Sequence, residues 1–121
     1  MARILLVDDD LYTLTSIETF LRSLKHEVFK AEDGEAGLQA ALQHRPELII
    51  LDALMPKKDG FQVLEELRRF RRTAQTPVLM LSGLDQPWDR EEARRRGAAD
   101  FLTKPVDRAE LMNRLSLLLG R

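Results

Sequence analysis

A small set of acidic, hydroxyl and amine side chains follows the short aliphatic runs of this 121-residue chain. Its members are Asp8, Asp9, Asp10, Asp52, Ser82 and Lys104. The aliphatic runs have the length and apolar character of strands buried on both faces, as in a parallel sheet. In such a sheet, ligands bind beyond the carboxyl ends of the strands. We therefore expect the carboxylates, the hydroxyl and the ammonium group to converge on one edge of the sheet.

Carboxylates held within about 5 Å of one another repel, so this cluster requires a cation or raised pKa values. A hard divalent ion with few protein ligands and several waters is typical of Mg²⁺. A carboxylate beside Mg²⁺ can attack a phosphoryl group, because the ion neutralises the charge that develops on the oxygens. Lys104 would add a second positive charge, and Ser82 a donor hydroxyl. The set predicts phosphoryl transfer onto an aspartate.

Taken one at a time, the same residues have ordinary structural explanations. An aspartate after a strand is typically a helix N-cap or a turn residue. We assign Asp10 to the cap of the helix that follows it, and Asp59 to a turn with Gly60. Ser82 alone would be a turn hydroxyl, and Lys104 alone a surface lysine. Only their combination at the ends of different strands favours a site.

Five strand-like runs alternate with helical periodicity along the chain. The strand-like runs are 3–7, 27–31, 48–51, 78–81 and 100–103. Apolar residues at helical spacing occupy 11–24, 38–42, 61–67 and 111–118. The segment 85–96 predicts a weaker helix, since it has only Trp88 and Ala93 to bury. The order βαβαβαβαβα predicts one α/β domain over residues 1–121, a parallel sheet with helices on both faces.

Composition excludes several classes of protein. The chain has no cysteine, which excludes disulfides, thiolate catalysis and cysteine-based metal sites. A formal net charge of −1 provides no overall field for holding nucleic acid or an anionic membrane. No apolar run is long enough to span a bilayer, and no signal-peptide pattern is present. We expect a cytoplasmic domain that binds neither nucleic acid nor membrane.

Four stretches of the chain carry a resemblance to a known family. Residues 3–10, 48–60, 77–83 and 97–105 resemble bacterial response-regulator receiver domains in both order and spacing. The resemblance covers the whole chain as one receiver domain, 1–121, similar to the single-domain chemotaxis receivers. It implies a flavodoxin-like, doubly wound (βα)5 fold, whose five-stranded parallel sheet has the strand order 2-1-3-4-5.

The resemblance also implies roles for the residues at the expected sheet edge. Asp52 matches the phosphoacceptor. Asp8 and Asp9 match the acidic pair that binds Mg²⁺ together with Asp52. The backbone carbonyl of Leu54 matches a further metal ligand, which leaves its side chain free to vary.

Further matching positions concern the phosphoryl group and the response to it. Ser82 and Lys104 match the residues that bind phosphoryl oxygens, and the peptide bond from Lys104 to Pro105 is expected to be cis. Phe101 matches the aromatic switch residue, which turns inward when Ser82 moves toward the phosphoryl group.

The implied function is that of a phosphorylation-activated switch in a two-component system. A histidine kinase or phosphotransfer protein would donate the phosphoryl group. A downstream protein would bind the face formed by helix 85–96, strand 100–103 and the last helix. Such a receiver catalyses only its own phosphorylation and dephosphorylation, as a monomer or as a phosphorylation-dependent dimer. It would either stand alone or form part of a longer regulator.

Some positions depart from the usual family pattern or lie outside its motifs. Leu54 and Leu84 are apolar where the family often has polar side chains along the path of the hydrolytic water, which predicts slow self-dephosphorylation. Trp88 is interpreted as a packing anchor or a partner contact. The arginines of 68–72 and 94–96 are interpreted as solvated faces. The acids expected to pair with these arginines are Glu65, Glu66, Glu91 and Glu92.

Three other functions compete with the signalling switch. An aspartate-based phosphohydrolase would need a second aspartate at position 54, which is Leu54. A flavin-binding protein of this fold would need a phosphate-binding loop after the first strand, where this chain has three aspartates. A receiver that acts as a phosphorylation-independent scaffold would not need the intact acidic set.

Overall fold

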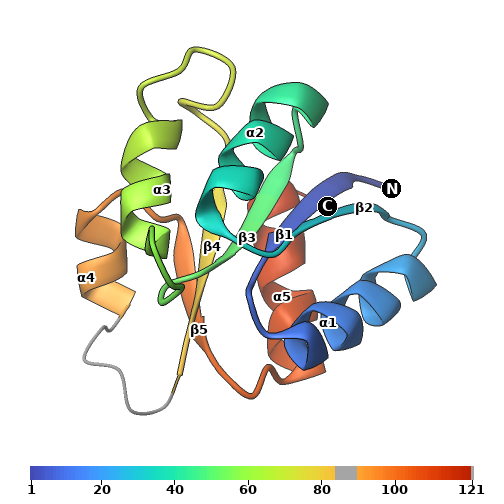
Figure 1. Cartoon of the computed structure of the whole chain (residues 1–121). Helices are drawn as coiled ribbons and strands as arrows, with labels where there is room; N and C mark the ends of the chain where they lie inside the picture. Colours follow the sequence, from blue (N-terminus) through green and yellow to red (C-terminus); the bar gives the residue numbers. More distant parts are fainter. Residues whose placement is uncertain (84–89, 121) are drawn as a thin grey trace.

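A five-stranded parallel sheet forms the centre of the molecule (Figure 1). The computed structural model describes residues 1–83 and 90–120. The strands are β1 (Arg3–Val7), β2 (Glu27–Ala31), β3 (Leu48–Asp52), β4 (Val78–Ser82) and β5 (Asp100–Thr103). They lie in the order β2-β1-β3-β4-β5 and pair in parallel throughout. The predicted fold class and strand order are confirmed.

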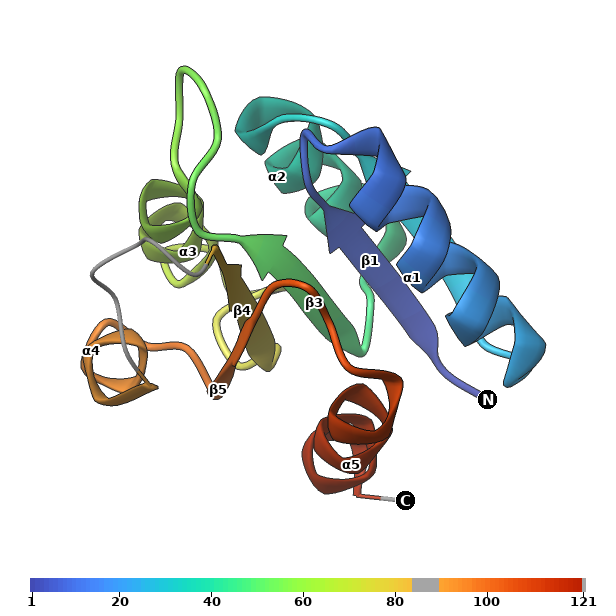
Figure 2. The same cartoon turned by 90° about the horizontal axis from the view of Figure 1, so that it is seen from below.

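Helices cover both faces of this sheet, as Figure 2 shows. They are α1 (Leu11–Ser23), α2 (Gly34–His44), α3 (Gly60–Leu67), α4 (Arg90–Arg95) and α5 (Arg108–Leu119). Successive strand residues point to opposite faces, so Leu5 belongs to the buried layer beneath α2, α3 and α4, while Leu6 belongs to the layer beneath α1 and α5. The two buried layers hold the strand ends in fixed positions. Among the described residues, no helix has both the length and the apolar character needed to cross a membrane.

Aspartates cap the helices that begin at the carboxyl edge of the sheet. Asp10 accepts a hydrogen bond from the backbone of Tyr12, which confirms its assignment as the cap of α1. Asp59 is the N-cap of α3 and forms a capping box with Gln62, so it does more than the predicted turn requires. These caps fix where the chain leaves the strands, and therefore where the neighbouring side chains lie.

The weak helix predicted over 85–96 is present in the described part of that segment. It runs from Arg90 to Arg95, and Ala93 is its buried residue among those described. Leu84 and Trp88 lie outside the described residues.

Candidate phosphoryl-transfer site

Three carboxylates converge at the carboxyl edge of the sheet, as the sequence predicted. Asp8 follows β1, Asp9 is the next residue, and Asp52 ends the adjacent strand β3. One carboxylate oxygen from each lies within 4.8 Å of the others. Asp8 and Asp52 are buried, whereas Asp9 is exposed. The cluster is therefore anchored in the core and open to solvent on one side.

Lys104 reaches this cluster from the connection between β5 and α5. Its Nζ lies 2.8 Å from Asp8 Oδ2 and 3.4 Å from Asp52 Oδ1. Burial alone would lower the pKa of Lys104, but its contacts with Asp8 and Asp52 outweigh burial and raise the pKa. The peptide bond between Lys104 and Pro105 is cis. The site thus contains one ammonium group shared between two buried carboxylates.

Asp52 has the perturbed titration expected of a functional carboxyl group. Burial, and next the charge of Asp8, raises the pKa of Asp52 to about 7, although Lys104 acts in the opposite direction. The backbone N–H of Leu54 donates to Asp52 Oδ1 over 3.4 Å. One lysine does not compensate for the buried negative charge, so a further cation would favour the ionised form of Asp52.

The donor atoms in the cluster fit Mg²⁺. Three carboxylates supply the hard oxygen ligands that this ion prefers. The buried Oδ2 of Asp8 has the ion pair with Lys104 but no hydrogen bond of regular geometry among the described residues. A buried carboxylate oxygen is normally satisfied by hydrogen bonds or by a metal. Three carboxylates with one ammonium group between them therefore support a cation site formed by Asp8, Asp9 and Asp52.

Ser82 and Phe101 lie on β4 and β5, the two strands that follow β3 across the sheet. Ser82 is fully buried and ends β4, one residue beyond Leu81, which pairs with Asp52. Its Oγ lies 3.3 Å from the carbonyl of Gly83, to which it donates. Phe101 is 8% exposed and belongs to the core layer beneath α2, α3 and α4. The predicted hydroxyl and the predicted aromatic switch thus lie on neighbouring strands.

The connection from β3 to α3 borders the cluster. The Leu54 side chain is 55% exposed, while Met55 is buried beneath it. A Cβ atom added to Gly60 would lie 2.2 Å from the backbone oxygen of Asp52, so only glycine permits this approach. Lys57 adopts a left-handed backbone with φ of 72°. The connection therefore packs closely against the end of β3.

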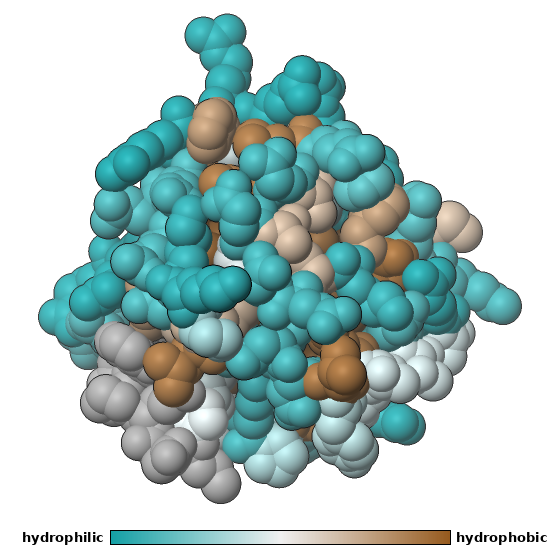
Figure 3. All heavy atoms as spheres, in the orientation of Figure 1, coloured by the Kyte–Doolittle hydropathy of each residue, from teal (hydrophilic) through white to brown (hydrophobic). Residues whose placement is uncertain are grey.

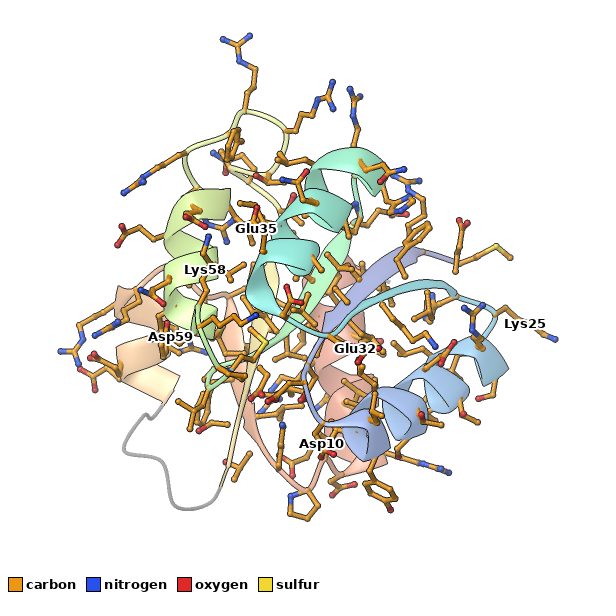
Figure 4. The ribbon with its side chains drawn as sticks, viewed as in Figure 1. Asp10, Lys25, Glu32, Glu35, Lys58 and Asp59 are labelled. Atoms are coloured by element: carbon orange, nitrogen blue, oxygen red, sulfur yellow. The ribbon has the colours of Figure 1, made fainter. Side chains whose placement is uncertain are left out.

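Lys58 is a residue of this connection that the sequence analysis did not identify. Its Nζ lies 2.8 Å from Glu66 Oε2 on α3 and 3.2 Å from Glu35 Oε2 on α2. Lys58 and Glu35 are labelled in Figure 4. Lys58 ties the connection to two helices. No sequence pattern could have found it, because its partners lie 8 and 23 residues away on separate elements.

A cleft of about 360 Å³ adjoins Lys104, between α1 and the start of α5. Its apolar walls include Ile17, Phe20 and Leu111. Tyr12 and Arg108 also line it, and the Arg108 guanidinium carbon lies 5.4 Å from the centre of the Phe20 ring. An apolar surface therefore runs up to the carboxylate cluster.

Comparison with known proteins agrees with this geometry. The family model described as "Response regulator receiver domain" matches residues 4–116. Protein PilH of Pseudomonas aeruginosa is 37% identical, over 99% of this chain and 99% of its own. The DNA-binding dual master transcriptional regulator RpaA of Synechocystis is 44% identical, over all of this chain. This chain spans 50% of the length of RpaA.

A solved structure matches the whole arrangement as well. It is the receiver domain of the sensor histidine kinase PA1611 from Pseudomonas aeruginosa, described with a magnesium ion in its active-site cleft. The TM-score is 0.89 at 33% identity, over 99% of this chain and 98% of that one. The likeness extends to the edge of the sheet where the carboxylates of this chain converge.

Proposed function

This chain belongs to the response regulator receiver domains of two-component systems, and we propose that Asp52 is the residue that accepts the phosphoryl group. Receiver domains are signalling proteins that interact with histidine kinases or phosphotransfer proteins and with downstream effectors. The observation that carries the proposal is the position of Asp52. It is a buried carboxylate with Lys104 Nζ at 3.4 Å and two further aspartates within reach.

Asp52 is proposed to act as a nucleophile. One of its carboxylate oxygens attacks phosphorus, the bond from phosphorus to the donor histidine nitrogen breaks, and the imidazole retains the electron pair. Asp52 must be ionised for this attack. Asp8, Asp9 and Asp52, with the backbone carbonyl of Leu54, would hold Mg²⁺, which when bound neutralises charge on the phosphoryl oxygens.

Lys104 and Ser82 are proposed to bind the phosphoryl group once it is on Asp52. A phosphoryl group adds about −1.5 to −2 charge and strong acceptor oxygens, so it attracts the Lys104 ammonium away from Asp8. Ser82 would turn its hydroxyl toward the same oxygens. Because Phe101 lies on the neighbouring strand, a shift of Ser82 would let the ring reposition and change the face formed by α4, β5 and α5.

The cleft beside Lys104 is proposed to receive the phosphodonor. A protein that carries a phosphohistidine must bring that side chain to Asp52 and cover neighbouring surface. The 360 Å³ cleft between α1 and α5 offers an apolar surface for this contact. Its position supports docking on the same side of the molecule as the carboxylates.

The phosphorylated state is proposed to be long-lived. Hydrolysis of the acyl phosphate needs a water placed in line with phosphorus, and polar side chains help to position such a water. The exposed Leu54 side chain stands two residues after Asp52 and offers no hydrogen bond. Leu84, the other position expected to matter, lies outside the described residues.

The direct test is phosphorylation by acetyl phosphate with and without Mg²⁺, followed by intact-protein mass spectrometry. We expect a gain of one phosphoryl group that requires Mg²⁺ and is lost in Asp52→Asn. The matched control is Asp10→Asn, because Asp10 lies beside the cluster but caps α1. Equal labelling of Asp52→Asn would contradict the assignment. If the wild-type protein gained no phosphoryl group, the result would favour the alternative of a phosphorylation-independent scaffold.

A further inference from the structure

A group of arginines lies at the end of the molecule opposite Asp52. There α2 ends at His44 and α3 at Leu67, at the edge where the parallel strands begin (Figure 1). Arg45 is the C-cap of α2, and Arg72 lies in the connection from α3 to β4. Arg72 Nη1 donates to the carbonyl of Leu42 over 3.1 Å, so the connection lies against the last turn of α2. Hydrophilic side chains project from this end (Figure 3).

We define Arg45, Phe70, Arg71 and Arg72 as the arginine patch. The three arginines are exposed, and Phe70, which precedes two of them in the chain, is 43% exposed. An exposed aromatic ring next to several guanidinium groups is a composition enriched at protein interfaces.

Arg71 and Arg72 lack the acidic partners that the sequence predicted, and Arg45 has no acidic partner among the described residues either. Glu65 pairs with Arg69 at 2.9 Å, but Glu66 pairs with Lys58 and is not available to the patch. In the part of the chain that the structure describes, no carboxylate lies within 4.0 Å of Arg45, Arg71 or Arg72.

The second arginine cluster shows the contrast. Arg96 pairs with Glu92 at 3.1 Å, and Arg95 pairs with the same carboxylate. The expected pairing with nearby glutamates is therefore seen for Arg69, Arg95 and Arg96, and not for Arg71 or Arg72.

Helix stabilisation accounts for only part of the patch. Cations near the last carbonyls of a helix interact favourably with its dipole, which explains Arg45 and Arg72 at the end of α2. It does not explain Arg71, which makes no hydrogen bond or ion pair with the described residues, or the exposed ring of Phe70. These two residues provide a charge and an apolar surface that the fold does not use.

We propose that the arginine patch binds an acidic segment of another polypeptide, in which carboxylates flank an apolar side chain. Arginine is suited to this role because its planar guanidinium can pair with a carboxylate through two hydrogen bonds. The apolar side chain would pack on Phe70. The guanidiniums need no new conformation of the backbone to accept these partners.

A polypeptide fits the patch better than a nucleic acid does. Nucleic-acid affinity grows with the number of phosphates neutralised, and about three contacts give weak binding at physiological salt. The formal net charge of the chain is −1, so the remaining surface provides no supporting field. A short acidic segment needs only a few guanidinium groups as partners.

The position of the patch has a functional consequence. It lies at the opposite edge of the sheet from Asp52, so a bound segment leaves the carboxylate cluster and the cleft beside Lys104 open. The patch would hold the domain on a partner in both phosphorylation states. The inference does not depend on the identity of the phosphoacceptor.

Fluorescence anisotropy can test this binding with the labelled peptide Gly-Glu-Asp-Phe-Glu-Asp-Gly as the probe. We expect the Arg71→Glu variant to bind at least about fivefold more weakly than the wild-type protein. The matched control is Arg94→Glu, which makes the same charge change at another exposed arginine and should alter affinity less than about twofold. Arg71 is exposed and makes no hydrogen bond or ion pair with the described residues, so its substitution should leave the melting temperature unchanged.

Two further arms separate the alternatives. Asp52→Asn should bind the peptide as the wild-type protein does, and Phe70→Ala should bind it less tightly. Three outcomes would each overturn the proposal. The first is an equal loss of affinity in Arg71→Glu and Arg94→Glu, and the second is tighter binding of a labelled DNA duplex than of the peptide. The third is no binding of the peptide at 1 mM, a concentration on the order of the weakest specific affinities.

Discussion

The Nζ atom of Lys104 lies closer to Asp8, at 2.8 Å, than to Asp52, at 3.4 Å. The lysine is therefore paired chiefly with a carboxylate proposed to bind the metal. Lys104 and Mg²⁺ must then compete for Asp8 in the unphosphorylated protein. Phosphorylation would end the competition by giving the ammonium group a better partner.

We expect Lys104→Met to bind Mg²⁺ about three- to tenfold more tightly than the wild-type protein, because a competing positive charge is removed. Isothermal titration calorimetry without a phosphodonor measures this directly. The control is Lys58→Met, which removes an ammonium group held by Glu35 and Glu66 instead. Unchanged or weaker Mg²⁺ binding by Lys104→Met would show that the lysine does not compete.

The raised pKa of Asp52, about 7, makes Mg²⁺ binding depend on pH. Because the ion requires the ionised carboxylate, we expect its affinity to rise by up to about tenfold per pH unit below pH 7 and to level off above it. Calorimetric titrations from pH 5.5 to 8.5, roughly the range around that pKa, test this slope. A flat profile would indicate that Asp52 is already ionised at pH 5.5, well below its expected pKa.

The same titration affects stability without the metal. The folded state binds the Asp52 proton up to about pH 7, whereas an unfolded aspartate loses it near pH 4. The folded state thus binds more protons between these values, so the free energy of unfolding should fall as pH rises from about 4 to 7. We expect this fall to be smaller in Asp52→Asn, and smaller in wild-type protein with saturating Mg²⁺. Urea denaturation at several pH values measures both.

Much of the site could be predicted from the sequence because its side chains occupy strand ends. The aliphatic run before Asp8 and the one that ends at Asp52 specify buried parallel strands, and parallel strands bring their carboxyl ends together. Lys104 could be placed near them for the same reason. The preference of Lys104 for Asp8 over Asp52 could not be predicted, because the position of a long flexible side chain depends on the charges around it.

Contacts between separate elements were beyond the sequence analysis. Glu66 was expected to pair with the arginines that follow it on the helix. It pairs with Lys58 instead, because the connection after β3 folds back over α3. Helical spacing describes neighbours on one helix and carries no information about a lysine arriving from a loop. For the same reason, the sequence could not show that Arg71 is left without Glu66 as a partner.

Gly60 should tolerate no side chain, because an added Cβ atom would lie 2.2 Å from the carbonyl oxygen of Asp52. We expect Gly60→Ala to lower the free energy of unfolding by about 3 kcal/mol or more and to weaken Mg²⁺ binding by displacing the end of β3. The comparison variant is Gly120→Ala, where φ is 72° but nothing lies within 4 Å of the added atom. It should cost only about 1 kcal/mol, from backbone conformation alone. Equal costs in urea denaturation would contradict the close approach.

Lys57 lies in the left-handed region with φ of 72°, a conformation that glycine adopts without the Cβ penalty. We expect Lys57→Gly to raise the free energy of unfolding by up to about 1 kcal/mol. Lys57→Ala removes the same charge but keeps the Cβ atom, so it should produce no gain. Chemical denaturation of the three proteins distinguishes backbone strain from the loss of a surface charge, since a charge effect would stabilise both variants equally.

The exposed Leu54 side chain, 55% accessible and two residues after Asp52, should slow hydrolysis of the acyl phosphate. We expect Leu54→Asn to shorten the half-life of the phosphorylated protein by about tenfold, less than the roughly 10²–10⁴-fold of a general base, because an amide can orient the water but does not take its proton. The control is Leu117→Asn, an equally conservative change at a leucine that is 67% exposed on α5. Decay of the phosphorylated mass after removal of acetyl phosphate gives the rates. A wild-type half-life of seconds, or equal rates for Leu54→Asn and the wild-type protein, would remove Leu54 from the explanation and leave hydrolysis to be set by the residues that bind the phosphoryl oxygens.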